Sequence, residues 1–370
     1  MSEERLLATF LELVRTDSPS RSEGAVAARV ASILEGLGCE VGFDDSVSKT
    51  GSETGNLVAT LPGTAPGRAV AFSAHLDTVE PGRGIEPTVA GGRVRASGET
   101  VLGADDKSGI AAIIEALTRA VEDGRPRPEV TVVLTVCEEC GLLGAKSLDR
   151  GVDLGDLCLV LDAEGAVGGI VTAAPTHHTF VARFRGKASH AGVRPEAGRS
   201  AIVMASRAVA AMTLGRLDGR TTANIGTIEG GTATNVVAAQ AVLTGECRSI
   251  DPVRVEEVRQ AMDLALSDAA SSGGGRVDVS WTKEYGGFSW EDDHPLLSLV
   301  ETACGDAGIV PRRFETGGGS DANVFADRGV PALVLSTGMT DVHGTDESLS
   351  VADLSALTRL LEAVLGRALD

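Results

Sequence analysis

Short apolar segments alternate with helical patterns along much of the chain, and this alternation limits its fold more than any other feature. Continuous apolar runs of strand length occur at residues 56–61, 69–74, 130–137, 157–161 and 331–335. Apolar residues at helical spacing lie between several of these runs, for example at residues 107–121. Strands that are apolar on both faces and are joined by helices are typical of a parallel sheet that helices cover on both sides. We therefore predict an α/β domain with a mostly parallel, doubly covered sheet.

The middle of the chain follows a different order of elements. Strand patterns at residues 178–186, 223–228, 236–248 and 276–283 combine with helical patterns at residues 200–214 and 253–271. The resulting order, β-α-β-β-α-β, is the signature of a ferredoxin-like domain. We therefore predict an inserted ferredoxin-like βαββαβ lid domain at residues 176–287, and a discontinuous α/β domain formed by residues 1–175 and 288–370.

Charge and composition exclude several classes of partner. The chain has 33 basic and 52 acidic residues, a formal net charge of −19, and only 3% aromatic residues. Such a surface repels phosphate backbones and anionic lipid headgroups. No apolar run reaches the ~18 residues that a membrane helix needs. We expect no nucleic-acid partner and no membrane partner, and the six scattered cysteines are typical of a reducing, cytoplasmic compartment.

Histidines and carboxylates follow the predicted strands at the ends where ligands bind in open α/β sheets. Imidazole and carboxylate groups brought together at one sheet edge are what a two-metal site needs, with one carboxylate bridging the ions. The sequence therefore predicts such a site. Its candidate residues, in chain order, are His75, Asp77, Asp105, Asp106, Glu138, Glu139, Asp162, Asp341 and His343.

Each of these residues has a simpler explanation when it is taken alone. Asp105 could be a helix N-cap, Asp162 a turn residue, and His75 a hydrogen-bonded histidine of the core. Glu138 and Glu139 are harder to explain, because two carboxylates that end an apolar strand are costly to bury unless they are paired or bound to metal. The joint occurrence of these residues at one sheet edge favours the metal site.

Two residue pairs have no assigned role. Cys137 and Cys140 match a C-x-x-C pattern, but strand geometry places such residues on opposite faces, so we expect buried thiols here. His177 and His178 lie at the predicted junction of the two domains, where hinge or surface histidines are the simplest explanation.

Together these motifs resemble a known family, the co-catalytic metallo-exopeptidases and deacylases that include aminoacylase, succinyl-diaminopimelate desuccinylase and peptidase T. The resemblance covers nearly the whole chain. It includes residues 75–78 (His-Leu-Asp-Thr), 103–107 (Gly-Ala-Asp-Asp-Lys) and 186–192 (Gly-Lys-Ala-Ser-His-Ala-Gly), as well as the candidate residues up to His343. The 103–107 segment and the aspartate at position 162 are most similar to the peptidase T branch.

The resemblance implies a specific set of metal ligands. His75 and Asp162 would hold one divalent ion, Glu139 and His343 the other, and Asp105 would bridge the two. We expect zinc, while cobalt and manganese also suit these ligands.

The resemblance also implies roles for the residues beside the ions. Asp77 would orient His75 by a hydrogen bond. Glu138 would be the general base that takes a proton from the metal-bridging water. A cis peptide bond is expected between Asp105 and Asp106.

The inserted domain is implied to bind substrate. His190 would contact the substrate carbonyl, in some relatives from a neighbouring subunit, and Asn235 and Arg248 match positions that contact substrate. Arg248 could bind a peptide carboxylate, or it could pair with a surface acid. Gly319, within residues 317–323, resembles a glycine loop on the substrate side. An exposed strand of the lid domain could also support a homodimer by edge pairing.

The expected function is hydrolysis of peptide bonds by a dinuclear metallo-exopeptidase, specifically an aminopeptidase that acts on short peptides. A carboxypeptidase or an N-acyl amino-acid amidohydrolase (aminoacylase-like) would use the same site and is the alternative. A binding protein on a retired enzyme scaffold is a third hypothesis, but every expected ligand and catalytic position is present in the chain.

Overall fold

A computed structural model describes residues 2–370 and divides them into two compact units. Unit 1 contains the chain up to Thr172, together with Trp290–Glu315 and Ser320–Asp370. Unit 2 contains Ala173–Ser289 and the short segment Thr316–Gly319. The sequence does not indicate this last segment as part of unit 2. It belongs there because Gly319 packs against Tyr285, where an added Cβ would lie 2.3 Å from the ring atom Cζ.

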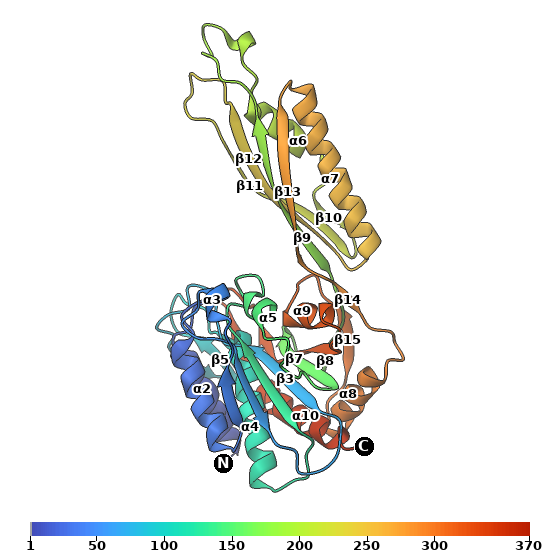
Figure 1. The fold of residues 1–370 in the computed structure, drawn as a ribbon. Helices are drawn as coiled ribbons and strands as arrows, with labels where there is room; N and C mark the ends of the chain where they lie inside the picture. The colour runs from blue at the N-terminus through green and yellow to red at the C-terminus, as the bar shows by residue number, and fades with distance from the viewer. Residues whose placement is uncertain (1) are drawn as a thin grey trace. The chain divides into compact units, whose positions relative to one another are not determined.

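Unit 1 contains most of a nine-stranded sheet with the order β1-β2-β6-β3-β7-β16-β8-β14, in which β15 also pairs with β8 (Figure 1). The end strand β14 and the last two residues of β8 belong to unit 2. The strands are β1 (Glu40–Phe43), β2 (Leu57–Leu61), β3 (Val70–His75), β6 (Val130–Thr135), β7 (Leu157–Ala163), β8 (Gly169–Ala174), β14 (Phe288–Ser289), β15 (Arg312–Glu315) and β16 (Ala332–Ser336).

The prediction of a mostly parallel sheet is wrong for the outer strands. Only the central strands β6, β3, β7 and β16 are parallel to one another. The pairs β1–β2, β2–β6, β16–β8 and β14–β8 are antiparallel. Strands β3, β6 and β16 are buried at every residue, so the apolar runs correctly indicate burial on both faces. Direction depends instead on which distant strand pairs with which, and an apolar run carries no information about that.

The helices of unit 1 complete its core. Helix α4 packs on β3 and β7 through buried residues at the spacing of one helix face, among them Ile110, Ile113, Ile114 and Leu117. Helices α1 and α10 pack on α4, and α9 packs on β16. The helices are α1 (Ser2–Arg15), α2 (Gly24–Gly36), α3 (Val47–Thr50), α4 (Ala104–Glu122), α5 (Leu143–Ser147), α8 (Pro295–Asp306), α9 (Asp321–Asp327) and α10 (Val351–Arg367).

A second, four-stranded sheet joins two distant parts of unit 1. Its order is β17-β18-β5-β4, with β4 at Pro87–Ala90, β5 at Arg93–Ala96, β17 at Met339–Thr340 and β18 at Ser348–Ser350. The antiparallel pairing of β18 with β5 places the chain around His343 close to the segment that leads into α4.

Unit 2 is a five-stranded antiparallel sheet with two helices (Figure 1). Its order is β10-β11-β12-β9-β13, and alternate residues of β9, namely Phe180, Ala182 and Phe184, are buried in the core shared with α6 and α7. Strand β10 was not expected and forms a hairpin with β11. The elements are β9 (Thr176–Arg185), η1 (Pro195–Ala197), α6 (Ala201–Ala211), β10 (Gly215–Asp218), β11 (Thr221–Gly230), β12 (Gln240–Ser249), α7 (Pro252–Ser272) and β13 (Arg276–Tyr285).

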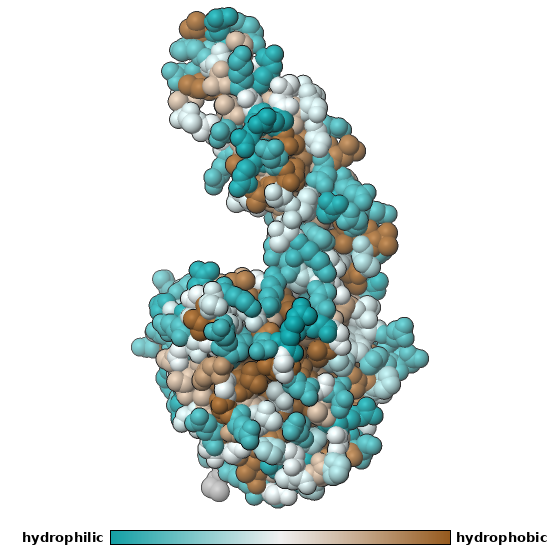
Figure 2. All heavy atoms as spheres, viewed as in Figure 1, coloured by the Kyte–Doolittle hydropathy of each residue, from teal (hydrophilic) through white to brown (hydrophobic). Residues whose placement is uncertain are grey.

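The surface agrees with the composition. Figure 2 shows hydrophilic residues spread over the visible face of both units, with hydrophobic residues in small groups between them. Within residues 2–370, no helix combines the length and the apolar character that crossing a lipid bilayer requires.

Candidate metal centre

The central parallel strands bring three groups of predicted ligands to one edge of the sheet. His75 is the last residue of β3, and Asp162 is the last residue but one of β7. Glu138 and Glu139 follow β6 after a short turn. Because β3, β6 and β7 run parallel, their carboxyl ends meet at the same edge.

The remaining ligands come from the two segments that lie over this edge. Asp105 is in the first turn of α4, after Gly103, which has φ 72°. His343 lies between β17 and β18, at φ 63°. The peptide bond between Asp105 and Asp106 is cis, so that expectation is confirmed.

Asp105 contacts two groups of ligands with different oxygens. Its Oδ1 is 3.0 Å from Nε2 of His75, and that nitrogen is 3.9 Å from Oδ1 of Asp162. Its Oδ2 is 3.1 Å from Nε2 of His343, which is 2.8 Å from Oε1 of Glu139. His75, Asp105 and Asp162 therefore form one cluster that could hold a metal ion, and Asp105, Glu139 and His343 form a second.

The charges of this cluster fit two divalent cations. Hydrogen bonds to Asp105 and Glu139 raise the pKa of His343 to about 10. Burial lowers the pKa of His75, but hydrogen bonds to Asp105 and Asp77 outweigh burial and raise it well above its usual range. Burial, and then neighbouring carboxylates, raise the pKa of Asp162 well above its usual range. The raised pKa values indicate that positive charge stabilises this group of side chains, and two divalent cations would supply such charge.

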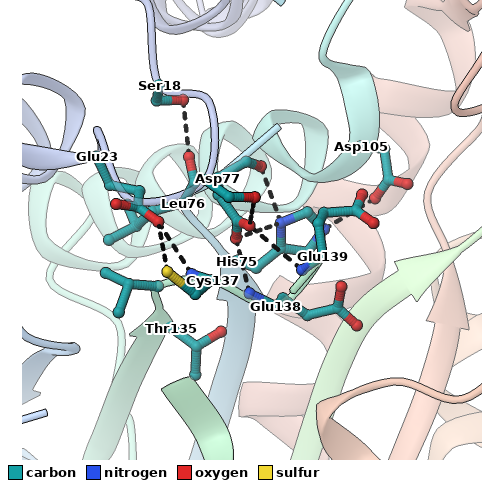
Figure 3. Close-up of polar contacts among 12 residues, drawn as sticks. Ser18, Glu23, His75, Leu76, Asp77, Asp105, Thr135, Cys137, Glu138 and Glu139 are labelled. Atoms are coloured by element: carbon teal, nitrogen blue, oxygen red, sulfur yellow. Dashed lines mark hydrogen bonds and ion pairs between the residues drawn. The ribbon is translucent and has the colours of Figure 1, made fainter. Parts of the chain in front are cut away.

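Asp77 connects three parts of the site (Figure 3). Its main-chain oxygen is 2.9 Å from Nδ1 of His75, and its Oδ1 is 3.4 Å from the same nitrogen. Oδ1 also accepts a hydrogen bond from the main-chain N–H of Glu138 at 3.0 Å, and Oδ2 accepts one from the N–H of Glu139 at 3.2 Å. The hydroxyl of Ser20 donates to Oδ2. Asp77 therefore holds the main chain of both glutamates as well as the ring of His75.

Burial raises the pKa of Glu138 well above its usual range; His75 opposes this shift and Asp321 adds to it. Asp321 accepts a hydrogen bond from Thr135 at the end of β6, and its other oxygen is buried with no hydrogen-bond partner. Asp321 is not among the site residues expected from the sequence. The glycine-rich segment 317–323 that contains it is the only local signal for it.

Glu23 is another residue that sequence reasoning missed. It is fully buried, and its Oε1 accepts the main-chain N–H of Cys137 at 3.0 Å (Figure 3). Cys137 has φ 52° in the turn before Glu138, so Glu23 holds the main chain at a left-handed residue. An isolated glutamate before a helix carries no local signal of such a contact. Cys137 is buried as expected, but Cys140 is exposed, because the chain leaves the strand before reaching it.

His190 and Asn235 lie next to each other in unit 2. A β-bridge joins His190 to Val236, and the main-chain oxygen of Asn235 accepts the N–H of Ala191 at 2.9 Å. His190 and Asn235 are both exposed.

The two histidines without an assigned role lie on opposite faces of β9, as successive strand residues do. Nε2 of His177 is 2.8 Å from Oε2 of Glu246, and its ring centroid is 5.2 Å from that of Tyr285. His178 instead meets Trp281 edge-on, with centroids 6.4 Å apart.

Arg248 lies on the same face as His177 and is held by Glu246. Its Nε and Nη2 donate to the two oxygens of Glu246 at 3.2 and 2.9 Å, and its Nη1 donates to the hydroxyl of Tyr285 at 3.3 Å. Within residues 2–370, this leaves one N–H on each of Nη1 and Nη2 for another acceptor. Gly319 packs against the ring of Tyr285, so the space a side chain would need at position 319 is taken by that ring.

Comparisons with known proteins agree with this geometry. The model of peptidase family M20/M25/M40 matches residues 71–367. The uncharacterized protein YqjE of Bacillus subtilis (strain 168) is 40% identical over 368 residues, covering 100% of this chain and 99% of that protein.

Two solved structures are similar over nearly their whole length. Aminopeptidase PepT from Bacillus cereus ATCC 10987 superposes with a TM-score of 0.93 at 40% identity, covering 100% of this chain and 99% of that one. A tripeptidase from Staphylococcus aureus subsp. aureus Mu50 superposes with a TM-score of 0.95 at 34% identity, covering 99% and 98%. The chain therefore belongs to peptidase family M20/M25/M40, and it is a metallopeptidase of the peptidase T-like kind.

Proposed function

We propose that this protein is an aminopeptidase that removes the first residue from short peptides by hydrolysis at a dinuclear, zinc-loaded centre. The observation that carries the proposal is the arrangement of Asp105, whose two oxygens approach two separate ligand groups, with Glu138 buried beside them. The likeness to an aminopeptidase PepT and to a tripeptidase supports short peptides as the substrate.

His75 and Asp162 would hold one ion, Glu139 and His343 the other, and Asp105 both. When bound, the two ions would supply polarisation of the scissile carbonyl and a water molecule of lowered pKa. Glu138 would act as the general base and acid, taking a proton from the attacking water and giving it to the leaving nitrogen. Asp77 supports this step, because it fixes the main chain from which Glu138 extends. Hydrolysis proceeds without a covalent bond between enzyme and substrate.

Unit 2 supplies the groups that recognise the rest of the peptide. We propose that Arg248 binds the terminal carboxylate of the peptide, since two N–H groups of its guanidinium remain available beside those that contact Glu246 and Tyr285. His190 and Asn235, which lie side by side, are assigned to the substrate's carbonyl and amide groups. Gly319 is proposed to contact the substrate through its main chain.

The same features permit a second function. A carboxypeptidase or an N-acyl amino-acid amidohydrolase also binds a substrate with a terminal carboxylate. The available N–H groups of Arg248 could bind that carboxylate in any of these enzymes. The difference lies at the other end of the substrate, where an aminopeptidase requires a free amino group.

Product analysis separates the two functions. The metal-loaded protein is offered a free tripeptide and the same tripeptide with an acetylated amino group. Release of the first residue from the free peptide alone is the expected result. Cleavage of the acetylated peptide would instead assign the chain to the acylase or carboxypeptidase side.

A variant tests the role of Glu138. Glu138→Ala should bind both ions, because the proposed ligands are intact, and should lose about 10²–10⁴-fold in kcat, the usual contribution of general acid–base catalysis. Full activity of a Glu138→Ala variant with both ions bound would refute the mechanism.

A further inference from the structure

Glu347 is a buried carboxylate that lies outside the expected ligand set. It is 1% exposed and follows His343 by four positions in the sequence. Its Oε2 accepts hydrogen bonds from the main-chain N–H groups of Leu102 at 2.7 Å and Gly103 at 2.8 Å. Its Oε1 accepts one from the N–H of Asp105 at 3.0 Å. All three donors belong to the turn that opens α4.

This turn cannot hold its own shape through helical hydrogen bonds. Gly103 has a left-handed conformation, and Asp105 and Asp106 have φ/ψ values outside the helical region. The first N–H groups of a helix have no partner within the helix. The carboxylate of Glu347 accepts from one N–H group of the first turn, that of Asp105, and from those of Leu102 and Gly103 just before the helix, and the bonds span 242 to 245 residues of sequence.

The contact joins the two segments that lie over the edge of the sheet. One segment carries Asp105, whose oxygens approach both ligand groups. The other carries His343 and, four residues later, Glu347. The pairing of β18 with β5 brings these segments near each other, but it involves Arg93–Arg95 and not the ligand-bearing turn itself. Among the contacts described between the two segments, the hydrogen bond from the N–H of Asp105 to Oε1 of Glu347 is the one made directly to the main chain of Asp105.

The direct contacts of Glu347 are to main-chain N–H groups. Lys107 is fully buried and is attracted by the charge of Glu347, but its Nζ has no hydrogen-bond partner within the described residues. No salt bridge to Glu347 occurs in the described part of the chain. The charge of the carboxylate is therefore stabilised by main-chain N–H groups, whose direction is fixed, and this makes it a precise support for the turn.

We propose that Glu347 is a positioning residue of the metal centre. By holding the main chain from Leu102 to Asp105, it places the bridging carboxylate at the distance from His343 that binding of the second ion requires. The proposal rests on the dinuclear site of the proposed function but not on its substrate.

The test uses Glu347→Gln, which keeps the size of the side chain but replaces one acceptor oxygen by an N–H donor. In either orientation of the amide, at least one of the three main-chain N–H groups faces a donor. The matched control is Asp346→Asn, which removes the same charge at the adjacent, exposed position. Zinc affinity is measured by competition with a chelator, and the two-cobalt form is examined by electronic absorption and electron paramagnetic resonance.

The Glu347→Gln variant should bind at least one ion about 10- to 100-fold more weakly, as substitutions that disturb the support of a metal ligand typically do. Its two-cobalt form should lose the magnetic coupling that a shared carboxylate produces, while Asp346→Asn keeps the parent affinity and spectrum. Parent affinity and coupling in a folded Glu347→Gln variant would overturn the proposal.

If Glu347→Gln does not fold without metal, the Glu347→Asp variant tests the proposal instead. It keeps the charge and both oxygens but shortens the side chain by one methylene group, so it should fold and bind metal less tightly. Two-ion binding by Glu347→Asp with the parent affinity would overturn the proposal. Because these readouts need no peptide, they stand apart from any failure of the tripeptide assay.

Discussion

Asp77 offers the sharpest test of how the site is assembled, because one carboxylate makes several contacts that an amide cannot reproduce. Oδ1 accepts the N–H of Glu138 at 3.0 Å, and Oδ2 accepts the N–H of Glu139 at 3.2 Å and the hydroxyl of Ser20 at 2.6 Å. Asparagine has the same shape but one acceptor oxygen and one donor nitrogen. In Asp77→Asn, the N–H of one of the two glutamates therefore faces another N–H.

The magnitude follows from these contacts. Leaving a buried N–H without an acceptor costs about 1–3 kcal/mol. Loss of this hydrogen bond should also displace the main chain at Glu139, which is expected to bind an ion. Metal affinity should therefore fall about 10- to 100-fold. A tenfold loss corresponds to about 1.4 kcal/mol. The unfolding free energy of the metal-free protein and the metal affinity should therefore both decrease.

Two measurements on the same preparation check this prediction. Denaturant unfolding of metal-free protein gives the loss in stability, and calorimetric zinc titration gives the affinity and the number of ions bound. Asp293→Asn, at an exposed position of unit 1, is the matched control and should change neither quantity. An Asp77→Asn variant with parent stability and parent affinity for both ions would show that its hydrogen bonds do not position the glutamates.

Two further predictions concern protons. The pKa of His343 is raised to about 10, and those of His75 and Asp162 are raised well above their usual ranges, so zinc binding near pH 7 should release two or more protons, and affinity should increase with pH. Calorimetry in buffers of different ionisation enthalpy measures the release, and a buffer-independent enthalpy would contradict the prediction. Burial raises the pKa of Asp321 to about 6, so the folded chain holds this proton more tightly than the unfolded chain, and the associated stability is present at low pH and lost as pH rises to about 6. Asp321→Asn should therefore flatten the decline in stability of metal-free protein between about pH 4 and 6, and unfolding curves at several pH values that show an unchanged decline would refute this assignment.

Much of the candidate site follows from local sequence because of one geometric rule. His75, Glu138, Glu139 and Asp162 each lie at or just after the end of an apolar strand, and the carboxyl ends of parallel strands meet at one edge. Residue type and position after a strand are therefore enough to predict that these side chains come together. The rule does not extend to the outer strands, whose direction the apolar pattern leaves open and which turned out to be antiparallel.

By itself, the sequence determined the chemistry of the centre, since imidazole and carboxylate groups after buried strands are recognisable from residue type and order. Only the tertiary structure decided what holds those groups in place. Glu23 and Glu347 accept hydrogen bonds from main-chain N–H groups that are 114 and 242 residues away, respectively. Main-chain donors are the same at every residue, so nothing in the sequence marks which turn a buried carboxylate supports. That choice depends on which loops the folded sheets bring together.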